Sequence, residues 1–299
     1  HKAVLDACAE IEKWGGEITY LEVDETGLID LEELKNAIRK DTVLVSVMWA
    51  NNETGVIQAM DEIGKICAEK EVILMSDATQ VLGKLPIDLK KTGVHLAAFS
   101  AHKLYGPKGI GALYVCRRQP RVQLSGQLHG GGHEHGMRSG TLNVPGIVGF
   151  GKAVDIASAQ IEQEAERLMQ LRDLLEEKIL TSVEASFVNG HTEFRLPHVS
   201  NISFQCVDGQ DLMLHLKSAL CISSGSACTS ASLEPSHVLQ ALGMGSNRAK
   251  GGLRFSLGRM TSRDEIEKTV ELVEEAVAQI RSRSPLWDLY QKGIDIEQL

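Results

Sequence analysis

Aromatic residues are scarce in this chain. They make up 4% of its 299 residues, so the core has to be built from aliphatic side chains. No apolar run approaches the roughly 20 residues that a membrane-spanning helix needs. Basic residues are in the minority, and the net charge of −9 argues against a surface for nucleic acid or an anionic membrane. With 43% hydrophobic and 24% charged residues, the composition is that of a globular protein with a large core.

Cysteine is scarce as well. None of the six cysteines belongs to a Cys-x-x-Cys pair or has the spacing of a zinc site. Four lie in helix-like or strand-like patterns, where unreactive buried thiols are expected: Cys8, Cys67, Cys116 and Cys206. This usage favours a reducing compartment, which predicts a cytoplasmic protein with the mitochondrial matrix as the alternative.

Signals for a metal and for targeting are also weak. The histidines His129, His133 and His135 share a glycine-rich segment, but their spacing is poor evidence for zinc, so no metal is expected. The chain begins at His1, and no signal or transit peptide is visible. We therefore interpret it as a fragment or a processed chain.

What is present in the first half is an alternation of strand-like and helix-like patterns. Four apolar runs predict buried strands: Val43–Trp49, Val72–Met75, Leu96–Phe99 and Gly111–Val115. Helices are expected at Asp30–Lys40 and Asp61–Glu69. This alternation predicts an α/β fold with a mostly parallel sheet and helices on both faces.

The second half has a different pattern. Long amphipathic helices are expected over residues 161–179 and 262–280, and a capping box begins the second of them. Between them lie two strand-like runs, 199–204 and 252–257. Helices against a few antiparallel strands predict a smaller α+β domain. We place the boundary near residue 150, which gives a large domain over 1–150 and a small C-terminal domain over 151–299.

Polar side chains follow three of the predicted strands, at the sheet edge where ligands bind in α/β proteins. They are Asn51 and Asn52, then Asp77 and Gln80, then Ser100, His102 and Lys103. One chemistry uses such a set, because a lysine amine can form a Schiff base with pyridoxal phosphate while a carboxylate keeps the pyridine nitrogen protonated. The set also offers hydroxyl and imidazole donors for a phosphate, and amides for a ring oxygen.

Each of these residues has an ordinary explanation when taken alone. An aspartate after a strand usually begins a turn, a lysine there is usually solvated, and Asn51–Asn52 could be a turn. The signal is that three consecutive strand ends carry complementary groups.

Residues 221–231, CISSGSACTSA, place Cys228 among small polar residues. Such a segment is not expected to pack into a core, and its small residues predict a mobile loop. A thiol in a partly exposed site near a positive group is reactive. The alternative is a surface loop with an incidental cysteine.

Six segments carry a resemblance to a known family: NNETG, SDATQ, SAHKLYGPKGIGALY, GMRSGT, SSGSACTSASLEPS and LRFSLGR. They resemble the IscS/NifS group of cysteine desulfurases, which are class V aminotransferase-like, fold-type I pyridoxal-phosphate enzymes, and the resemblance covers almost the whole chain. It implies a homodimer that converts L-cysteine to L-alanine and transfers the sulfur to an enzyme cysteine as a persulfide. The sulfur would serve iron–sulfur cluster assembly or tRNA thiolation, through a scaffold or another acceptor protein. No direct contact with nucleic acid or membrane is implied.

The resemblance also implies roles for single residues. Lys103 would carry the cofactor, Cys228 would accept the sulfur, and His1 would stack on the cofactor ring. Further cofactor contacts would come from Asp77 at the pyridine nitrogen, Gln80 and Asn52 at the ring oxygen or substrate side, Ser100 and His102 at the phosphate, and Thr141 at the phosphate of the partner subunit. Arg254 would bind the substrate carboxylate, and Asn52 would be a second substrate-binding residue.

The chain departs from the family pattern in several places. His135 stands where an arginine is usual, and Lys250–Gly252 stand where His-Ser-Ser is usual. The resemblance implies roughly a further hundred residues, with a phosphate-binding loop, before His1. The alternatives are another class V enzyme, such as a selenocysteine lyase or an aminotransferase, and a truncated, non-catalytic binding subunit.

Overall fold

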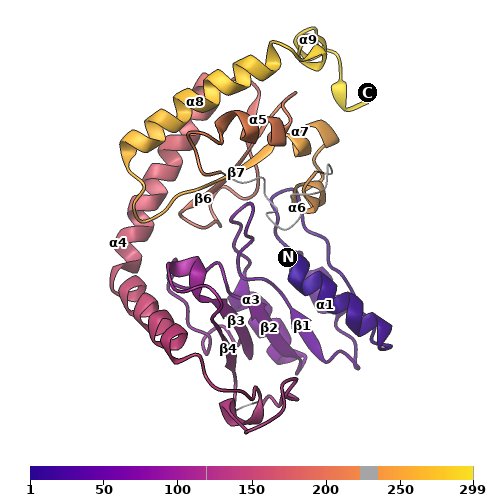
Figure 1. Ribbon diagram of the computed structural model, residues 1–299. Helices are drawn as coiled ribbons and strands as arrows, with labels where there is room; N and C mark the ends of the chain where they lie inside the picture. Colours follow the sequence, from indigo (N-terminus) through magenta and orange to yellow (C-terminus); the bar gives the residue numbers. More distant parts are fainter. Residues whose placement is uncertain (119, 223–234, 299) are drawn as a thin grey trace. The chain divides into compact units, whose positions relative to one another are not determined.

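The computed structural model describes residues 1–118, 120–222 and 235–298 (Figure 1). The chain forms two compact units. One comprises residues 38–50 and 59–163, and we call it the parallel-sheet unit. The other comprises residues 1–37, 51–58 and 164–299, and we call it the antiparallel-sheet unit.

This division differs from the predicted domains, 1–150 and 151–299. The N-terminal residues and the segment 51–58 belong with the C-terminal part, and the later boundary lies inside the long helix α4 (Val144–Ser182). Backbone hydrogen bonds far apart in sequence cause the grouping: Leu196 donates to the Gly55 carbonyl at 2.8 Å, and Ile57 donates to the Phe194 carbonyl at 2.8 Å. A local pattern does not reveal such pairs, and no turn marks a boundary inside a continuous helix.

The parallel-sheet unit contains a four-stranded sheet in the order β1-β2-β3-β4 (Figure 1). Its strands are β1 (Leu44–Ser46), β2 (Ile73–Asp77), β3 (Leu96–Ser100) and β4 (Gly111–Val115). The first three are parallel, and β4 is antiparallel to β3. The predicted mixed sheet of an α/β protein is therefore confirmed.

Helix α3 (Met60–Glu69) packs against β2 and buries Ile63 and Cys67 completely. Gly64 lets the backbone at Thr92 approach this helix, because a Cβ atom there would lie 1.9 Å from the Thr92 carbonyl oxygen. Helix α4 begins in the same unit, and its Phe150 and Ala157 pack with residues of the short 3₁₀ helix η1 (Ala101–Leu104). Helix packing thus fixes the segment that follows β3.

The prediction of buried strands is wrong for the first and the fourth, because residues 111–113 of β4 are exposed as well. Val43 is 80% exposed and Leu44 41% exposed, and within β1 only Val45 is buried. Successive side chains of a strand point to opposite faces of the sheet, and in β1, an edge strand of the described sheet, one face is exposed. A continuous apolar run does not distinguish an edge strand from a central one.

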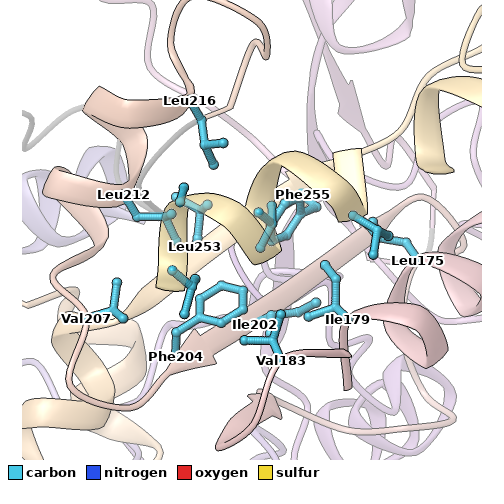
Figure 2. Close-up of a cluster of buried hydrophobic side chains, with 14 of the residues drawn as sticks. Leu175, Ile179, Val183, Ile202, Phe204, Val207, Leu212, Leu216, Leu253 and Phe255 are labelled. Atoms are coloured by element: carbon cyan, nitrogen blue, oxygen red, sulfur yellow. The ribbon is translucent and has the colours of Figure 1, made fainter. Parts of the chain in front are cut away.

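The antiparallel-sheet unit contains a second sheet of three strands: β5 (Ser186–Val188), β6 (Val199–Phe204) and β7 (Gly252–Ser256). Figure 2 shows the core on this sheet, where Ile202, Phe204, Leu253 and Phe255 meet helix residues such as Leu175. The core is mostly aliphatic, as the composition predicts. Strand β6 is buried along its whole length, including its polar residues.

The helices around this second sheet include α5 (Gly209–Leu216) and α8 (Arg263–Arg281), which pack on each other. The predicted capping box is present at the start of α8, where Glu265 N–H donates to Ser262 Oγ at 3.2 Å and Ser262 N–H donates to Glu265 Oε2 at 2.8 Å. The remaining helical elements of the described chain are α1 (Lys2–Lys13), α2 (Leu31–Ala37), α6 (His237–Ala241), α7 (Ser246–Lys250), α9 (Pro285–Gln291), η2 (Glu134–Gly136) and η3 (Ile296–Gln298). Within the described ranges, no helix has the length and apolar character needed to span a bilayer.

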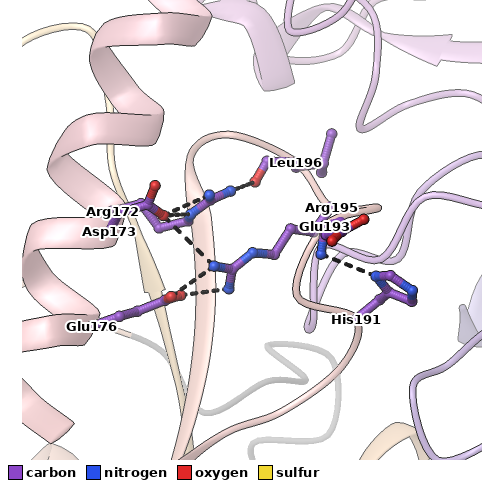
Figure 3. Close-up of polar contacts among 7 residues, drawn as sticks. All are labelled: Arg172, Asp173, Glu176, His191, Glu193, Arg195 and Leu196. Atoms are coloured by element: carbon purple, nitrogen blue, oxygen red, sulfur yellow. Dashed lines mark hydrogen bonds and ion pairs between the residues drawn. The ribbon is translucent and has the colours of Figure 1, made fainter.

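A buried polar cluster ties α4 to the segment 191–196 (Figure 3). The Arg195 guanidinium donates to both carboxylate oxygens of Glu176, at 2.6 and 2.7 Å. Arg172 donates to Asp173 at 2.6 Å and to the Leu196 carbonyl at 2.9 Å. Because the backbone of residues 194 and 196 pairs with residues 55 and 57, this cluster also supports the segment 51–58.

Candidate active site

The ends of strands β2 and β3 carry the polar residues that the sequence singles out. The two strands are parallel neighbours, and Asp77, the last residue of β2, pairs with Ala98 of β3. Ser100 ends β3, and η1 follows at once with His102 and Lys103. The carboxyl ends of adjacent parallel strands lie at one sheet edge, so these groups come from one edge of the parallel-sheet unit.

Asp77 is a half-buried carboxylate in a fixed position. Its Oδ1 accepts a hydrogen bond from the Thr79 N–H at 3.0 Å, and its own carbonyl accepts from the Trp49 N–H at 2.9 Å. Ala78 donates to the Ala98 carbonyl at 3.1 Å, which continues the pairing with β3 into the turn that holds Gln80. The negative charge is thus anchored between β1 and β3.

The segment after β3 presents a hydroxyl, an imidazole and an amine. Ser100 Oγ and His102 Nδ1 are hydrogen-bonded at 2.8 Å, and the side chains of His102 and Lys103 are exposed. The turn closes through a hydrogen bond from the Gly106 N–H to the Ala101 carbonyl at 2.9 Å. A Cβ atom at position 106 would lie 2.8 Å from that carbonyl oxygen, so glycine is required there.

The NNETG segment forms a tight turn in the antiparallel-sheet unit. Asn51 Oδ1 accepts hydrogen bonds from the N–H groups of Glu53 and Thr54, at 2.8 and 3.0 Å. Gly55 has a φ of 80°, and a Cβ atom there would lie 3.2 Å from the Val199 side chain. Asn51 therefore stabilises a turn, which is the ordinary explanation for this residue given above. Asn52 lies at the tip of the same turn.

Arg254 of β7 is held by this turn. Its Nη1 donates to the Asn52 carbonyl at 2.8 Å, and β7 pairs it with Asn201 of β6. Burial lowers the pKa of the Arg254 guanidinium, and the Glu53 carboxylate acts in the opposite direction. Arg254 and Asn52, which the sequence assigns to the substrate side, are thus in contact through the backbone carbonyl of Asn52.

Two residues of this region have no role in the sequence-based prediction. Glu53 is 2% exposed, and its Oε2 accepts a hydrogen bond from Ser236 Oγ at 2.5 Å. Both belong to segments that the family resemblance uses, NNETG and SLEPS, but no local signal marks them as a buried pair. Their proximity depends on tertiary contacts between residues far apart in sequence.

The remaining predicted site residues lie in separate places. His1 is an exposed residue that caps α1, with Nδ1 accepting from the Ala3 N–H at 3.2 Å. Thr141 is exposed in the segment before α4. Cys228 lies outside the described residues. Asn52, Arg254 and His1 thus belong to the antiparallel-sheet unit, and the residues after β2 and β3, with Thr141, belong to the parallel-sheet unit.

The histidines of the glycine-rich segment make local contacts. His133 Nδ1 accepts from the Gly140 N–H at 3.3 Å, and His135 has a φ of 57° within η2. Across the described part of the chain, no group of three or more His, Cys, Asp or Glu side chains could hold a metal ion.

Comparison with known proteins gives a consistent result. The chain matches the family described as aminotransferase class-V over residues 1–269. It is 54% identical to the cysteine desulfurase IscS of Histophilus somni strain 2336, over all of this chain and 73% of that protein. A solved NifS-like protein aligns with a TM-score of 0.85 at 34% identity, covering 93% of this chain and 73% of the other. A NifS-like protein from Rickettsia africae gives 0.81 at 32% identity, covering 90% and 72%.

The family match over residues 1–269 and the similarity of the fold show that the chain belongs to the class V aminotransferase family. Within the family it belongs to the cysteine desulfurases. Proteins of this class depend on pyridoxal phosphate.

The residues after β2 and β3 fit this cofactor. Lys103 is exposed and would offer its amine to the aldehyde, and Asp77, fixed by the Thr79 N–H, would offer its carboxylate to the pyridine nitrogen. The Ser100–His102 pair supplies a hydroxyl and an imidazole for the phosphate. All of these groups come from the neighbouring ends of β2 and β3, at one edge of the sheet.

Proposed function

We propose that this chain is a cysteine desulfurase that removes sulfur from L-cysteine, releases L-alanine and keeps the sulfur as a persulfide on Cys228. The observation that carries the proposal is the placement of Asp77, Ser100, His102 and Lys103 at neighbouring ends of β2 and β3. The chain is also 54% identical to a cysteine desulfurase over its whole length.

The residues of the parallel-sheet unit hold the cofactor. Bound pyridoxal phosphate supplies an electron sink that stabilises negative charge at the substrate α-carbon. Lys103 binds the aldehyde through its amine, and Asp77 keeps the pyridine nitrogen protonated by its nearby charge. Ser100 and His102 bind the phosphate, and Gln80, in the turn after Asp77, contacts the ring oxygen. The hydrogen bond from Thr79 to Asp77 supports this role, because it fixes the carboxylate without neutralising it.

Arg254 binds the substrate carboxylate. A guanidinium is a planar fork that matches a carboxylate, and every amino-acid substrate has one. The hydrogen bond from Arg254 to the Asn52 carbonyl supports the assignment, because it orients the fork before the ligand arrives. The amide of Asn52 lies at the tip of the same turn, on the substrate side.

Cys228 is the sulfur acceptor. Its thiolate attacks the substrate sulfur, and a sulfur–sulfur bond forms as the carbon–sulfur bond breaks. The electron pair of the broken bond stays with the three-carbon fragment, which takes up a proton and leaves as L-alanine. The step balances without an external oxidant, since the substrate is reduced as the persulfide is formed. The support for this assignment is the small, polar sequence around Cys228 and its place in the family motif.

The same proposal extends to the assembly. We expect a homodimer in which Thr141 reaches the phosphate of the partner subunit and His1 stacks on the cofactor ring. The sulfur passes to an iron–sulfur scaffold or another acceptor protein in the cytoplasm. The names of the relatives support a role in sulfur transfer.

The test is sulfide release from L-cysteine in the presence of a thiol reductant. Lys103→Ala should lose both the visible absorption of the bound cofactor and turnover, because the amine that holds the cofactor is gone. Cys228→Ser should keep the absorption and lose sulfide release. The proposal is wrong if Cys228→Ser remains fully active. It is also wrong if purified wild-type protein binds pyridoxal phosphate and releases no sulfur from L-cysteine.

A further inference from the structure

Glu53 is a buried carboxylate that the proposed reaction does not use. It is 2% exposed, and the Asn51 side chain fixes its backbone in the turn. Burial of a carboxylate is costly unless hydrogen bonds and an opposite charge compensate it. A group held this way in the turn beside the proposed substrate site needs a physical explanation.

Arg254 is a cation that contacts the turn holding Glu53. Strands β6 and β7 both contact the backbone of this turn. Arg254 Nη1 of β7 donates to the Asn52 carbonyl at 2.8 Å, and Asn201 Nδ2 of β6 donates to the Glu53 carbonyl at 3.3 Å. Asn201 also pairs with Arg254 across β6 and β7. Burial lowers the pKa of Arg254, and the charge of Glu53 opposes that shift, so the two groups attract each other.

The group that positions the Arg254 guanidinium, the Asn52 carbonyl, is not the group that supplies the negative charge, the Glu53 carboxylate. The hydrogen bond to the Asn52 carbonyl holds the Arg254 guanidinium in place. The Glu53 Oε2 atom is engaged elsewhere, since it accepts from Ser236 Oγ at 2.5 Å. The Ser236 hydroxyl in turn accepts from the Val238 N–H at 3.1 Å, so its own proton is available for Glu53. Ser236 therefore holds one carboxylate oxygen in a fixed direction.

We propose that Glu53 is the resident counter-ion of Arg254 and limits how tightly the guanidinium binds the carboxylate of an amino-acid ligand. The inference rests on the proposed function, in which Arg254 receives the substrate carboxylate. A ligand carboxylate and Glu53 share one cation, and two like charges near one cation weaken each other's binding. Substrate and product carry the same carboxylate, so the weaker attraction favours the release of L-alanine.

The measurement is the carboxylate preference, the ratio of the dissociation constants of L-alaninamide and L-alanine. Both are measured on the protein with its cofactor, from the change in cofactor absorption. Glu53→Gln keeps the size of the side chain and an acceptor oxygen for Ser236 but removes the charge. It should raise the preference about tenfold, through tighter binding of L-alanine.

Ser236→Ala should change the carboxylate preference in the opposite direction to Glu53→Gln. Without the hydroxyl, the Glu53 carboxylate can turn toward Arg254 and compete more strongly with the ligand, which should lower the preference about threefold. Thr54→Val is the matched control. Thr54 lies in the same turn and is 3% exposed, and its hydroxyl accepts only a long hydrogen bond from the Val56 N–H, at 3.4 Å. It should leave the preference unchanged.

Arg254→Ala separates this inference from the proposed function. It should reduce the preference to about one, because the cation is gone. If the preference survives in Arg254→Ala, the assignment of Arg254 is wrong. If Arg254→Ala abolishes the preference while Glu53→Gln lowers it or leaves it unchanged, the role of Glu53 is overturned and the proposed function stands. Should Glu53→Gln fail to fold, a raised or unchanged preference in Ser236→Ala overturns the inference by itself.

Discussion

At the scale of single residues, the proposed chemistry depends on an anchored negative charge beside an exposed amine. The Thr79 N–H fixes Asp77, and Lys103 projects from the 3₁₀ turn that follows the neighbouring strand. This arrangement makes Asp77 the residue on which the electron-sink property of the cofactor depends most.

Asp77→Asn should keep the fold and lower kcat for L-cysteine on the order of 10²-fold, the typical cost of removing one preorganised electrostatic partner. The amide has the same shape but does not hold a proton on the pyridine nitrogen. Steady-state kinetics on the cofactor-saturated protein would test this. Asp88→Asn is the control, because Asp88 caps an exposed turn of the same unit through the N–H groups of Lys90 and Lys91. An unchanged kcat in Asp77→Asn would contradict the assigned role.

The residue-level predictions succeed where the signal is local. Polar residues at strand ends are readable from the sequence, and the structure places Asp77 and Ser100–Lys103 at adjacent strand ends as expected. Burial is harder to predict. Cys67 and Cys206 are buried as expected, and burial raises the pKa of Cys67 to about 11, but Cys8 and Cys116 are partly exposed. The burial of Glu53 is not predictable from the sequence, because the burial of a charged residue depends on partners distant in sequence.

At the scale of elements, helix α4 and the segment 191–196 support the turn that holds Arg254. The link is the buried pair of Arg195 and Glu176, with Arg172 and Asp173 beside it (Figure 3). Removal of Glu176 would leave the buried Arg195 charge with only the exposed Asp173 carboxylate, 3.6 Å away, and an incompletely compensated buried charge is costly.

Glu176→Gln should therefore lower the free energy of unfolding by about 3–5 kcal/mol. Urea denaturation followed by circular dichroism measures the change. Glu267→Gln is the matched control on α8, because its contacts with Lys178 and Arg263 are exposed, and it should cost no more than about 1 kcal/mol. Equal losses in the two variants would contradict the importance of the buried pair.

The observed boundaries of helices and strands agree with the predicted ones where the sequence of the element itself contains a start or spacing signal. Strands β4 and β6 and the start of α8 lie where they are predicted, because apolar spacing and the Ser262 capping box are local. The strand-like pattern of residues 199–204 does not predict that Ser200 and Asn201 are fully buried. Those side chains face other parts of the fold, which a strand pattern does not show.

At the scale of the whole molecule, the sequence predicts the α/β class but not the grouping of segments. Residues 51–58 join the antiparallel-sheet unit through hydrogen bonds to residues 194 and 196, which no local pattern indicates. The proposed dimer belongs to this scale too. Val144, Ile147 and Val148, at the start of α4, are exposed apolar residues close in sequence to Thr141, which is proposed to reach the partner subunit.

Val148→Asp should therefore shift the protein toward monomer, because Val148 is 65% exposed in the single chain and a buried charge would oppose association. Sedimentation velocity over a range of concentrations measures the shift. Gln160→Asp, an exposed position further along the same helix, is the control of equal charge. A dimer of unchanged stability in Val148→Asp would place the subunit contact elsewhere.

The most direct test of the whole account is a single turnover with L-cysteine in the absence of reductant, followed by mass spectrometry of the protein's peptides. The account predicts one added sulfur atom on the peptide that contains Cys228 and one L-alanine released per chain. Neither should form in Lys103→Ala. Release of L-alanine with the added sulfur absent from Cys228, or sulfur on Cys228 in Lys103→Ala, would contradict it.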